Sequence, residues 1–330
     1  MIQEITKDFY LAKIPLPKSP LKDLNCYIIK DSEYNLLIDT GFNQPECKQA
    51  LLEAAAELKL DWHRTILFIT HLHSDHCGLA YFLQGLGARV ISGRVDGERL
   101  NSMFESAYWD FFGGLMRKYD LERFGITKHD HPGYAYRPEN QAQIELLDVG
   151  EKIKTGKYEF ELIDLAGHTP GQVGLLETSN KFLFVGDHML ATITPNIVEW
   201  TVLDDSLGLY MRNLQKVHDM DLNEVFPAHR ELITDYRARA KGLLKHHELR
   251  LNSVREIIKK GRQSVSEVAS QMEWEIRAKS WFDFPKGQKW FSSGEAASHL
   301  RHLCVIGELE QLNIDGIDYY EMKQRLRAKD

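Results

Sequence analysis

The junction between an apolar run and a cluster of metal-ligand residues at 65–76, TILFI followed by THLHSDH, constrains the fold more than any other feature. The apolar, β-branched run predicts a buried strand. Residues two apart on extended backbone point to the same side, so His71 and His73 can bind one ion together. After a turn, Asp75 and His76 can face a second ion. Histidines and carboxylates are rarely buried without partners, so the junction predicts a metal site at the end of a strand.

The rest of the chain up to about residue 230 alternates short apolar runs with helical segments. The runs CYIIKD, NLLIDTG, ARVISG, FELIDLA and KFLFVGD end near Gly, Asp or His, and helical patterns lie at 46–60 and after Gly78. Strands that alternate with helices predict a layered α/β core.

Three later segments offer further ligands, each after an apolar run. They are His168 in GHTPG, Asp187 in GDH and His229 in PAH. Each is a weak signal alone, because a histidine before Thr-Pro-Gly is an ordinary turn residue. Together and in this order they supply what a site for two ions needs beyond the first four ligands.

This ordered set resembles the metallo-β-lactamase superfamily over roughly residues 8–230, with Asp39 of IDTG as its early strand-end motif. The resemblance implies an α/β fold, a four-layer αβ/βα sandwich with the metals at one edge between two sheets. It implies a first ion bound by His71, His73 and His168, a second bound by Asp75, His76 and His229, and a bridging Asp187. Flavodiiron relatives carry a carboxylate where this chain has His73, which places it with the hydrolytic branch. The chain departs from the family at PAHR, where Pro-Gly-His is commoner.

A pair of metal ions predicts hydrolysis. Two dications lower the pKa of a bridging water, so that a metal-bridging hydroxide can attack a carbonyl or phosphoryl centre at neutral pH. We expect Asp75 to be catalytic by orienting this nucleophile and passing its proton to the leaving group. Imidazole and carboxylate ligands favour two zinc ions per chain, with iron or manganese as alternatives.

Two segments lie outside this pattern. Residues 95–142 are rich in aromatic side chains and are expected to form a helical insertion, a pair of helices that either packs on the core or lines a substrate cleft. The sequence of residues 236–330 predicts three helices followed by a strand, which is the order of a small winged-helix-like domain. Residues 1–235 are expected to form the catalytic domain. A serine N-cap is expected to open the second helix.

The leading functional prediction is a thioesterase or esterase acting on small acyl substrates, close to the glyoxalase II branch. An endoribonuclease acting on single-stranded RNA is one alternative, and an iron-dependent persulfide-type dioxygenase is another. From residue 236 on, 18 basic residues face 13 acidic ones, a net charge of +5, whereas residues 1–235 carry 23 against 35, or −12. The basic tail suits an anionic carrier on the substrate, such as CoA or glutathione, and is expected to pack beside the metal cleft. The acidic body disfavours a nucleic-acid partner.

The remaining features predict packing or location. No apolar run reaches the roughly 18 to 20 residues of a membrane span, and the first residues lack a signal-peptide pattern, so we expect a cytoplasmic protein without a membrane partner. Four cysteines without CxxC spacing suggest neither disulfides nor a sulfur-bound metal, and Cys77 is expected to pack beside the site. His188 is expected either to pack or to contact substrate. The sequence leaves the oligomeric state open.

Overall fold

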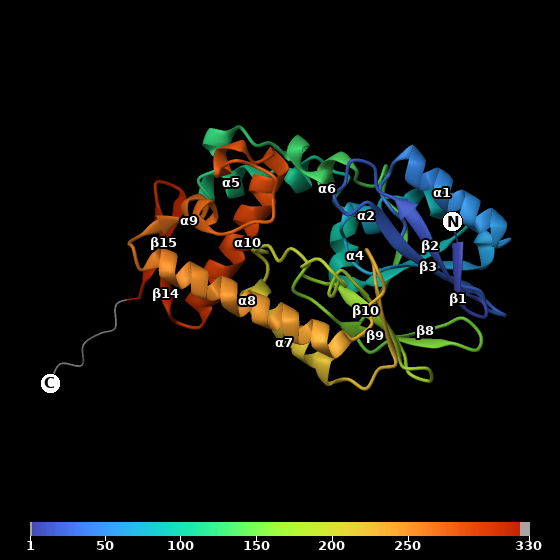
Figure 1. Cartoon of the computed structure of the whole chain (residues 1–330). Helices are drawn as coiled ribbons and strands as arrows, with labels where there is room; N and C mark the ends of the chain where they lie inside the picture. The colour runs from blue at the N-terminus through green and yellow to red at the C-terminus, as the bar shows by residue number, and fades with distance from the viewer. Residues whose placement is uncertain (1, 324–330) are drawn as a thin grey trace.

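The computed structural model, which describes residues 2–323, contains a seven-stranded mixed sheet whose strands lie in chain order (Figure 1). They are β1 (Ile2–Thr6), β2 (Phe9–Pro15), β3 (Asp23–Ile29), β4 (Asn35–Ile38), β5 (Thr65–Ile69), β6 (Arg89–Gly93) and β7 (Ile144–Leu147). Pairing is antiparallel from β1 to β4 and parallel from β4 to β7. The carboxyl ends of β4, β5 and β6 therefore lie at the same edge of the sheet.

A second sheet of five strands has the order β12-β11-β10-β9-β8. Its strands are β8 (Lys152–Lys154), β9 (Glu159–Asp164), β10 (Val173–Glu177), β11 (Phe182–Gly186) and β12 (Glu224–Pro227). Only β11 and β12 pair in parallel. Buried aromatic and aliphatic side chains of both sheets, among them Phe9, Phe68, Phe184 and Phe226, form one core between them.

Helices cover the outer faces of both sheets. On the first sheet, α1 (Pro45–Glu57) and α3 (Ala80–Gly85) bury Leu51 and Leu83 against the strands. On the second, α7 (Ser206–Asp219) packs against the strands, and the long α8 (Tyr236–Ile258) packs on α7. Each fully buried leucine contributes roughly 1.5–3 kcal/mol, so the apolar faces of these helices fix the layers. The predicted four-layer αβ/βα sandwich is confirmed.

The segment between β6 and β7 differs in detail from the predicted helical pair. It contains α4 (Arg94–Leu100), α5 (Phe111–Lys118) and α6 (Pro132–Ala135), with 3-10 turns at Ala107–Trp109, Glu122–Phe124 and Lys128–Asp130. Helix α5 is short and holds two adjacent glycines, each costing roughly 1 kcal/mol relative to alanine in a helix. The buried Trp109 packs with Leu72 and Met103, which favours turns over one continuous helix before α5.

The C-terminal region begins with α8 and continues with a short helix, a longer helix and a three-stranded sheet of order β13-β15-β14. Its further elements are β13 (Gln263–Ser264), α9 (Val265–Gln271), a 3-10 turn (Trp281–Asp283), α10 (Lys286–Val305), β14 (Leu309–Ile314) and β15 (Ile317–Met322). The predicted serine cap is confirmed, because Ser264 Oγ accepts from Glu267 N at 3.3 Å and Glu267 Oε2 accepts from Ser264 N at 2.7 Å.

The C-terminal region and the insertion share a core with the second sheet, and in Figure 1 the green α5 lies among the orange and red C-terminal elements. The ring of Trp290 on α10 lies 4.6 Å from that of Phe112 on α5, and Ser266 N donates to Tyr119 O at 3.2 Å. Removal of the C-terminal region would therefore expose this shared core. The domain boundary at 235/236 stays a prediction. None of the helices within residues 2–323 has both the length and the hydropathy needed to cross a bilayer.

Candidate metal centre

The seven predicted ligands lie at strand ends along one edge between the two sheets. His71 and His73 follow β5, Asp75 and His76 lie on α2 (Ser74–Cys77), His168 lies between β9 and β10, Asp187 follows β11, and His229 follows β12. The backbone at His73 is extended, with φ −64° and ψ 145°, and this residue caps α2. The strand end followed by a turn matches the geometry expected from the sequence.

Three histidines form a first group. His73 Nδ1 lies 3.1 Å from His71 Nε2 and 3.0 Å from His168 Nε2. The three nitrogens therefore surround a common point, as three ligands of one ion would.

Asp75, His76 and His229 form a second group. His229 Nε2 lies 3.3 Å from His76 Nε2 and 3.4 Å from Asp75 Oδ2, and His76 Nε2 lies 3.8 Å from the same oxygen. These atoms again face one common point.

Asp187 lies between the two groups. Its Oδ1 is 3.3 Å from His229 Nε2 and 3.7 Å from His76 Nε2, whereas its Oδ2 is 3.6 Å from His168 Nε2. One carboxylate oxygen thus faces each group, which is the geometry of a bridging ligand.

Outward hydrogen bonds decide which ring nitrogen faces the centre. His76 Nδ1 donates to Asp39 Oδ2 at 2.7 Å, His168 Nδ1 to Asn196 O at 2.9 Å, and His229 Nδ1 to Asp23 O at 2.8 Å. Since each partner can only accept at these positions, each Nδ1 carries the proton and each Nε2 presents a lone pair inward. Thr70 completes the pattern: its hydroxyl donates to Asp39 and so can accept from His71 Nδ1 at 3.0 Å.

The inward lone pairs fit a cation. The Nε2 lone pairs of neutral His76 and His229, 3.3 Å apart, repel unless an electrophile lies between them. The buried Asp187 Oδ1 has no hydrogen-bond partner among the described residues, and a buried carboxylate oxygen left in that state is costly. Neutral imidazoles with carboxylates are a donor set typical of zinc and suit other divalent transition metals.

The ionisation states of His73 and Asp75 match this donor set, whereas His76 holds a proton that a metal ion would have to displace. Burial, reinforced by His168, lowers the pKa of His73 to about 3, so its ring is neutral. Burial opposes ionisation of Asp75, but His76 and His229 outweigh it and lower the pKa of that carboxyl to about 2. Burial also disfavours charge on His76, yet Asp39 and then Asp75 raise its pKa well above the usual value. A positive charge on the His76 ring offsets the repulsion between the neighbouring carboxylates, and metal binding would release the proton that carries this charge.

Asp96 is a buried residue of the site that the sequence analysis missed. It accepts from Thr169 Oγ1 at 2.5 Å, Gly171 N at 2.7 Å and Leu72 N at 3.1 Å, which ties the His168 loop to the first ligand segment. Burial raises the pKa of Asp96 to about 6, although these donors oppose that shift. Its place three residues beyond β6, at the edge where β5 ends, is a signal that could have identified it.

Two neighbours of the ligands pack rather than coordinate. Cys77 is fully buried and its thiol donates to Leu72 O at 3.3 Å, and burial raises its pKa well above the usual value. His188 is fully buried against Tyr210, with ring centroids 5.1 Å apart, and burial lowers its pKa to about 3. Of the two alternatives for His188, the structure favours packing.

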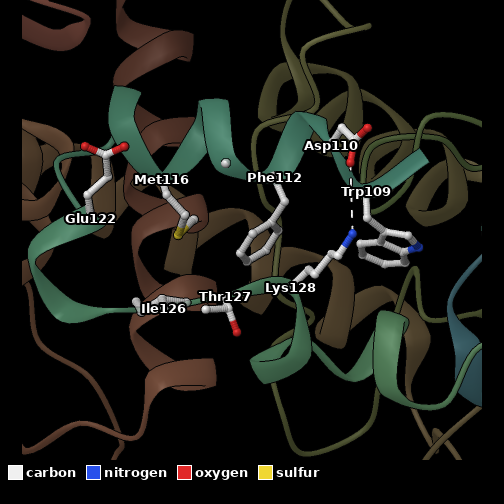
Figure 2. A pocket seen from close by; sticks show the side chains of 9 residues that line it. Trp109, Asp110, Phe112, Met116, Glu122, Ile126, Thr127 and Lys128 are labelled. Atoms are coloured by element: carbon white, nitrogen blue, oxygen red, sulfur yellow. Dashed lines mark ion pairs between the residues drawn. The ribbon is translucent and has the colours of Figure 1, made fainter. Parts of the chain in front are cut away.

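The insertion contains a cavity of about 440 Å³ between α5 and residues 122–128 (Figure 2). Figure 2 shows Phe112 and Met116 on α5 directed toward Ile126 and Thr127. At one end Lys128 Nζ lies 4.0 Å from Asp110 Oδ1. Trp109 lines the same end and also packs with Leu72, between two predicted ligands, so one side chain separates the cavity wall from the ligand segment.

Comparison with known proteins identifies the family of the chain. The pattern of the Metallo-beta-lactamase superfamily matches residues 22–229, which span all seven predicted ligands. The chain belongs to this superfamily. It is 32% identical to the hydroxyacylglutathione hydrolase GloC of Haemophilus influenzae over 49% of this chain and 65% of that protein. It is 25% identical to a probable metallo-hydrolase, YqjP, of Bacillus subtilis over 89% and 92%, and 24% identical to a human acyl-coenzyme A thioesterase over 62% and 72%.

A solved structure extends the similarity of fold to the whole chain. A metallo-beta-lactamase family protein of Thermus thermophilus, 23% identical in sequence, superposes with a TM-score of 0.78 over 97% of this chain and all of that one. The insertion and the C-terminal region thus belong to a fold that occurs elsewhere in the superfamily. Membership of the superfamily and these relatives indicate a metal-dependent hydrolase.

Proposed function

We propose that the protein is a dinuclear zinc hydrolase that cleaves thioesters of small acyl substrates. The observation that carries the proposal is Asp187, whose two oxygens face two separate groups of ligand atoms. His71, His73 and His168 would hold the first ion, and Asp75, His76 and His229 the second. Iron or manganese would suit the same donors, so zinc is the preferred assignment within that set.

The chemistry needs an activated water beside an ionised carboxylate. Two dications held by these residues would supply such a water at neutral pH and would stabilise negative charge on the carbonyl oxygen. Asp75, with a pKa of about 2, is ionised and can accept a hydrogen bond from the attacking water, which fixes its orientation. The oxygen of water bonds to the carbonyl carbon while one of its protons passes to Asp75, the carbon–sulfur bond breaks, and the sulfur leaves with the electron pair and takes that proton to give the free thiol. A thiol of pKa about 8.5 is a good leaving group that needs little help from an acid.

The relatives favour a thioester over other acyl compounds. The hydroxyacylglutathione hydrolase and the acyl-coenzyme A thioesterase are both named for cleaving an acyl group from a thiol carrier. The carriers differ, and the shared chemistry is the thioester bond.

We assign the apolar acyl part of the substrate to the cavity of the insertion. Its volume of about 440 Å³ is in the range of small-molecule sites, and Phe112, Met116 and Ile126 give it an apolar wall. Trp109 connects this wall to Leu72 in the ligand segment.

The basic residues of the C-terminal region give only weak support to the hypothesis that the substrate has an anionic carrier, because several of them are already paired. Arg250, Arg255 and Arg262 pair with Glu295, Glu308 and Glu321 of the same region. Such internal pairs also weaken the endoribonuclease alternative, because a phosphate backbone needs cations that are free to bind it. The element order of this region supports a winged-helix-like domain, and a cytoplasmic location stays a prediction.

A substrate panel tests the proposal. Metal-free protein is loaded with zinc, iron or manganese and given acetyl-CoA, octanoyl-CoA and lactoylglutathione, and released thiol is measured with a thiol-reactive dye. We expect thiol release that is restored by two zinc ions per chain. Cleavage of labelled single-stranded RNA, or oxygen uptake with glutathione persulfide, in a sample that releases no thiol would replace the thioesterase by the corresponding alternative.

A further inference from the structure

The segment between β11 and α7 lies between the metal centre and the C-terminal helix α10. Residues 191–200 contain no helix or strand, so hydrogen bonds to neighbouring elements decide their position. Asn196 O accepts the proton of His168 Nδ1 at 2.9 Å, and Trp200 Nε1 donates to His168 O at 2.9 Å. The segment therefore contacts a metal ligand through both its ring and its backbone.

The other side of the segment is held by α10. Asn196 Nδ2 donates to Glu295 Oε2 at 2.7 Å, and Glu199 N donates to Gly294 O at 3.0 Å. Glu295 is buried, and its second oxygen, Oε1, lies 2.7 Å from Arg250 Nε on α8. Burial raises the pKa of Glu295, whereas Arg250 and the Asn196 side chain oppose that shift and favour the charged carboxylate. A hydrogen bond to a charged carboxylate is about twice as strong as one between neutral groups, so the contact with Glu295 holds the Asn196 side chain in place.

We propose that Glu295 is a positioning residue for the first metal group, acting through Asn196 on His168. The contact chain runs from Arg250 to Glu295, then to the Asn196 side chain, and from the Asn196 carbonyl to the His168 ring. Outer partners of this kind keep a histidine ligand in one tautomer and one orientation. The C-terminal helices thus contribute to the metal centre without supplying a ligand. The proposal rests on the metal-binding part of the proposed function and not on the substrate.

The test compares two glutamates that each pair with an arginine of α8. Glu295→Gln keeps the shape of the side chain but removes its charge. Glu308→Gln does the same to the pair of Arg255 with Glu308, at 2.6 Å, which does not reach residues 191–200. Zinc affinity is measured on the full-length protein by competition with a coloured chelator, beside the midpoint of thermal unfolding.

We expect Glu295→Gln to weaken the first zinc site by roughly 10-fold and Glu308→Gln to leave zinc affinity unchanged. Asn196→Ala, which keeps the carbonyl but loses the tie to Glu295, is expected to weaken zinc binding to the same degree. The double variant Glu295→Gln/Asn196→Ala should be no weaker than either single one, because both act through one contact.

Unchanged zinc affinity in Glu295→Gln and Asn196→Ala would overturn the proposal, as would an equal loss in Glu308→Gln. If Glu295→Gln does not fold, Asn196→Ala alone decides. A wild-type protein that binds zinc but cleaves no thioester would defeat the proposed substrate and leave this inference standing. A wild-type protein that binds no metal would defeat both.

Discussion

Two buried groups of histidines in this protein differ in how their ring nitrogens are paired. In the metal centre, His76 and His229 donate outward from Nδ1, and their Nε2 atoms face each other at 3.3 Å. Between α8 and α10, His247 Nδ1 lies 3.2 Å from His299 Nε2, and His299 Nδ1 donates to Glu295 O at 2.7 Å. In the second pair each contact joins a donor to an acceptor, so no cation is needed to hold it.

Histidines that lie close together therefore do not by themselves form a metal site. The metal centre adds carboxylates, from Asp75 and Asp187, to converging lone pairs, whereas the pair of His247 with His299 has no carboxylate facing it within the described residues. The hydrogen bonds of His247 and His299 are those of packing residues. A relay of neutral rings stabilises the packing of α8 on α10, whereas facing lone pairs with carboxylates beside them could hold a metal ion.

The largest expected effect separates the two groups by substitution. His71→Ala should lower thioester kcat/KM by more than about 100-fold, since loss of an outer partner alone costs 10- to 100-fold. It should keep the native circular dichroism spectrum, because strands and not ions build the core. His299→Ala should instead keep zinc binding and lose roughly 2–4 kcal/mol of unfolding free energy, through a cavity and a broken hydrogen bond.

Urea unfolding of the metal-free proteins, with zinc titration of the same samples, measures both effects. In the metal-free state His71→Ala should be destabilised less than His299→Ala, since removing one of several facing lone pairs offsets part of the packing loss. Loss of zinc binding in His299→Ala, or failure of His71→Ala to fold, would break the distinction.

A smaller effect concerns the cavity of the insertion. Gly113 and Gly114 are adjacent on α5, and a Cβ atom added at either meets no atom within 4 Å, but only Gly113 lines the cavity. Gly113→Phe should fill the cavity and lower kcat/KM for octanoyl-CoA by roughly 10-fold relative to acetyl-CoA, through loss of apolar contact with the chain.

Gly114→Phe is the matched control, because it adds the same residue one position along without entering the cavity. It should leave the octanoyl-to-acetyl ratio unchanged. An equal change in both variants would indicate a general disturbance of α5, and no change in either would remove the acyl chain from this cavity.

The smallest effect is the pH dependence that the pair of His247 with His299 gives to stability. Burial lowers the pKa of His299 to about 3, and burial, followed by the charge of His299, lowers that of His247 well below the usual 6.5. The folded state therefore keeps both rings neutral, whereas the unfolded chain protonates them below pH 6.5. Stability is full above that pH and falls as the pH drops toward the folded values, by about 1.4 kcal/mol per histidine between pH 7.5 and 5.5.

Replacing His299 by glutamine removes one titrating group. The loss of unfolding free energy between pH 7.5 and 5.5, measured with urea on the metal-free protein, should then be smaller than in the wild type by about 1.4 kcal/mol. An identical pH dependence in wild type and variant would show that His299 is not neutral and buried in the folded state.

The sequence by itself determined part of the fold and the type of each predicted ligand. Short apolar runs predicted β3, β4, β5, β6, β9 and β11, and the period-two spacing of His71 and His73 at a strand end predicted their convergence. The serine cap at Ser264 was equally local, because a capping box needs only residues three apart. Each of these features depends on neighbours along the chain, which a sequence displays directly.

Only the tertiary structure decided how the ligands are held. The proton on His229 is set by a carbonyl 206 residues earlier, at Asp23, and the proton on His168 by Asn196, which depends on Glu295 about a hundred residues further on. The split of the predicted helical insertion into turns likewise follows from Trp109 meeting Leu72 across the fold. Such contacts arise when sheets and helices pack, and no local pattern records which distant carbonyl or carboxylate will face a given ring.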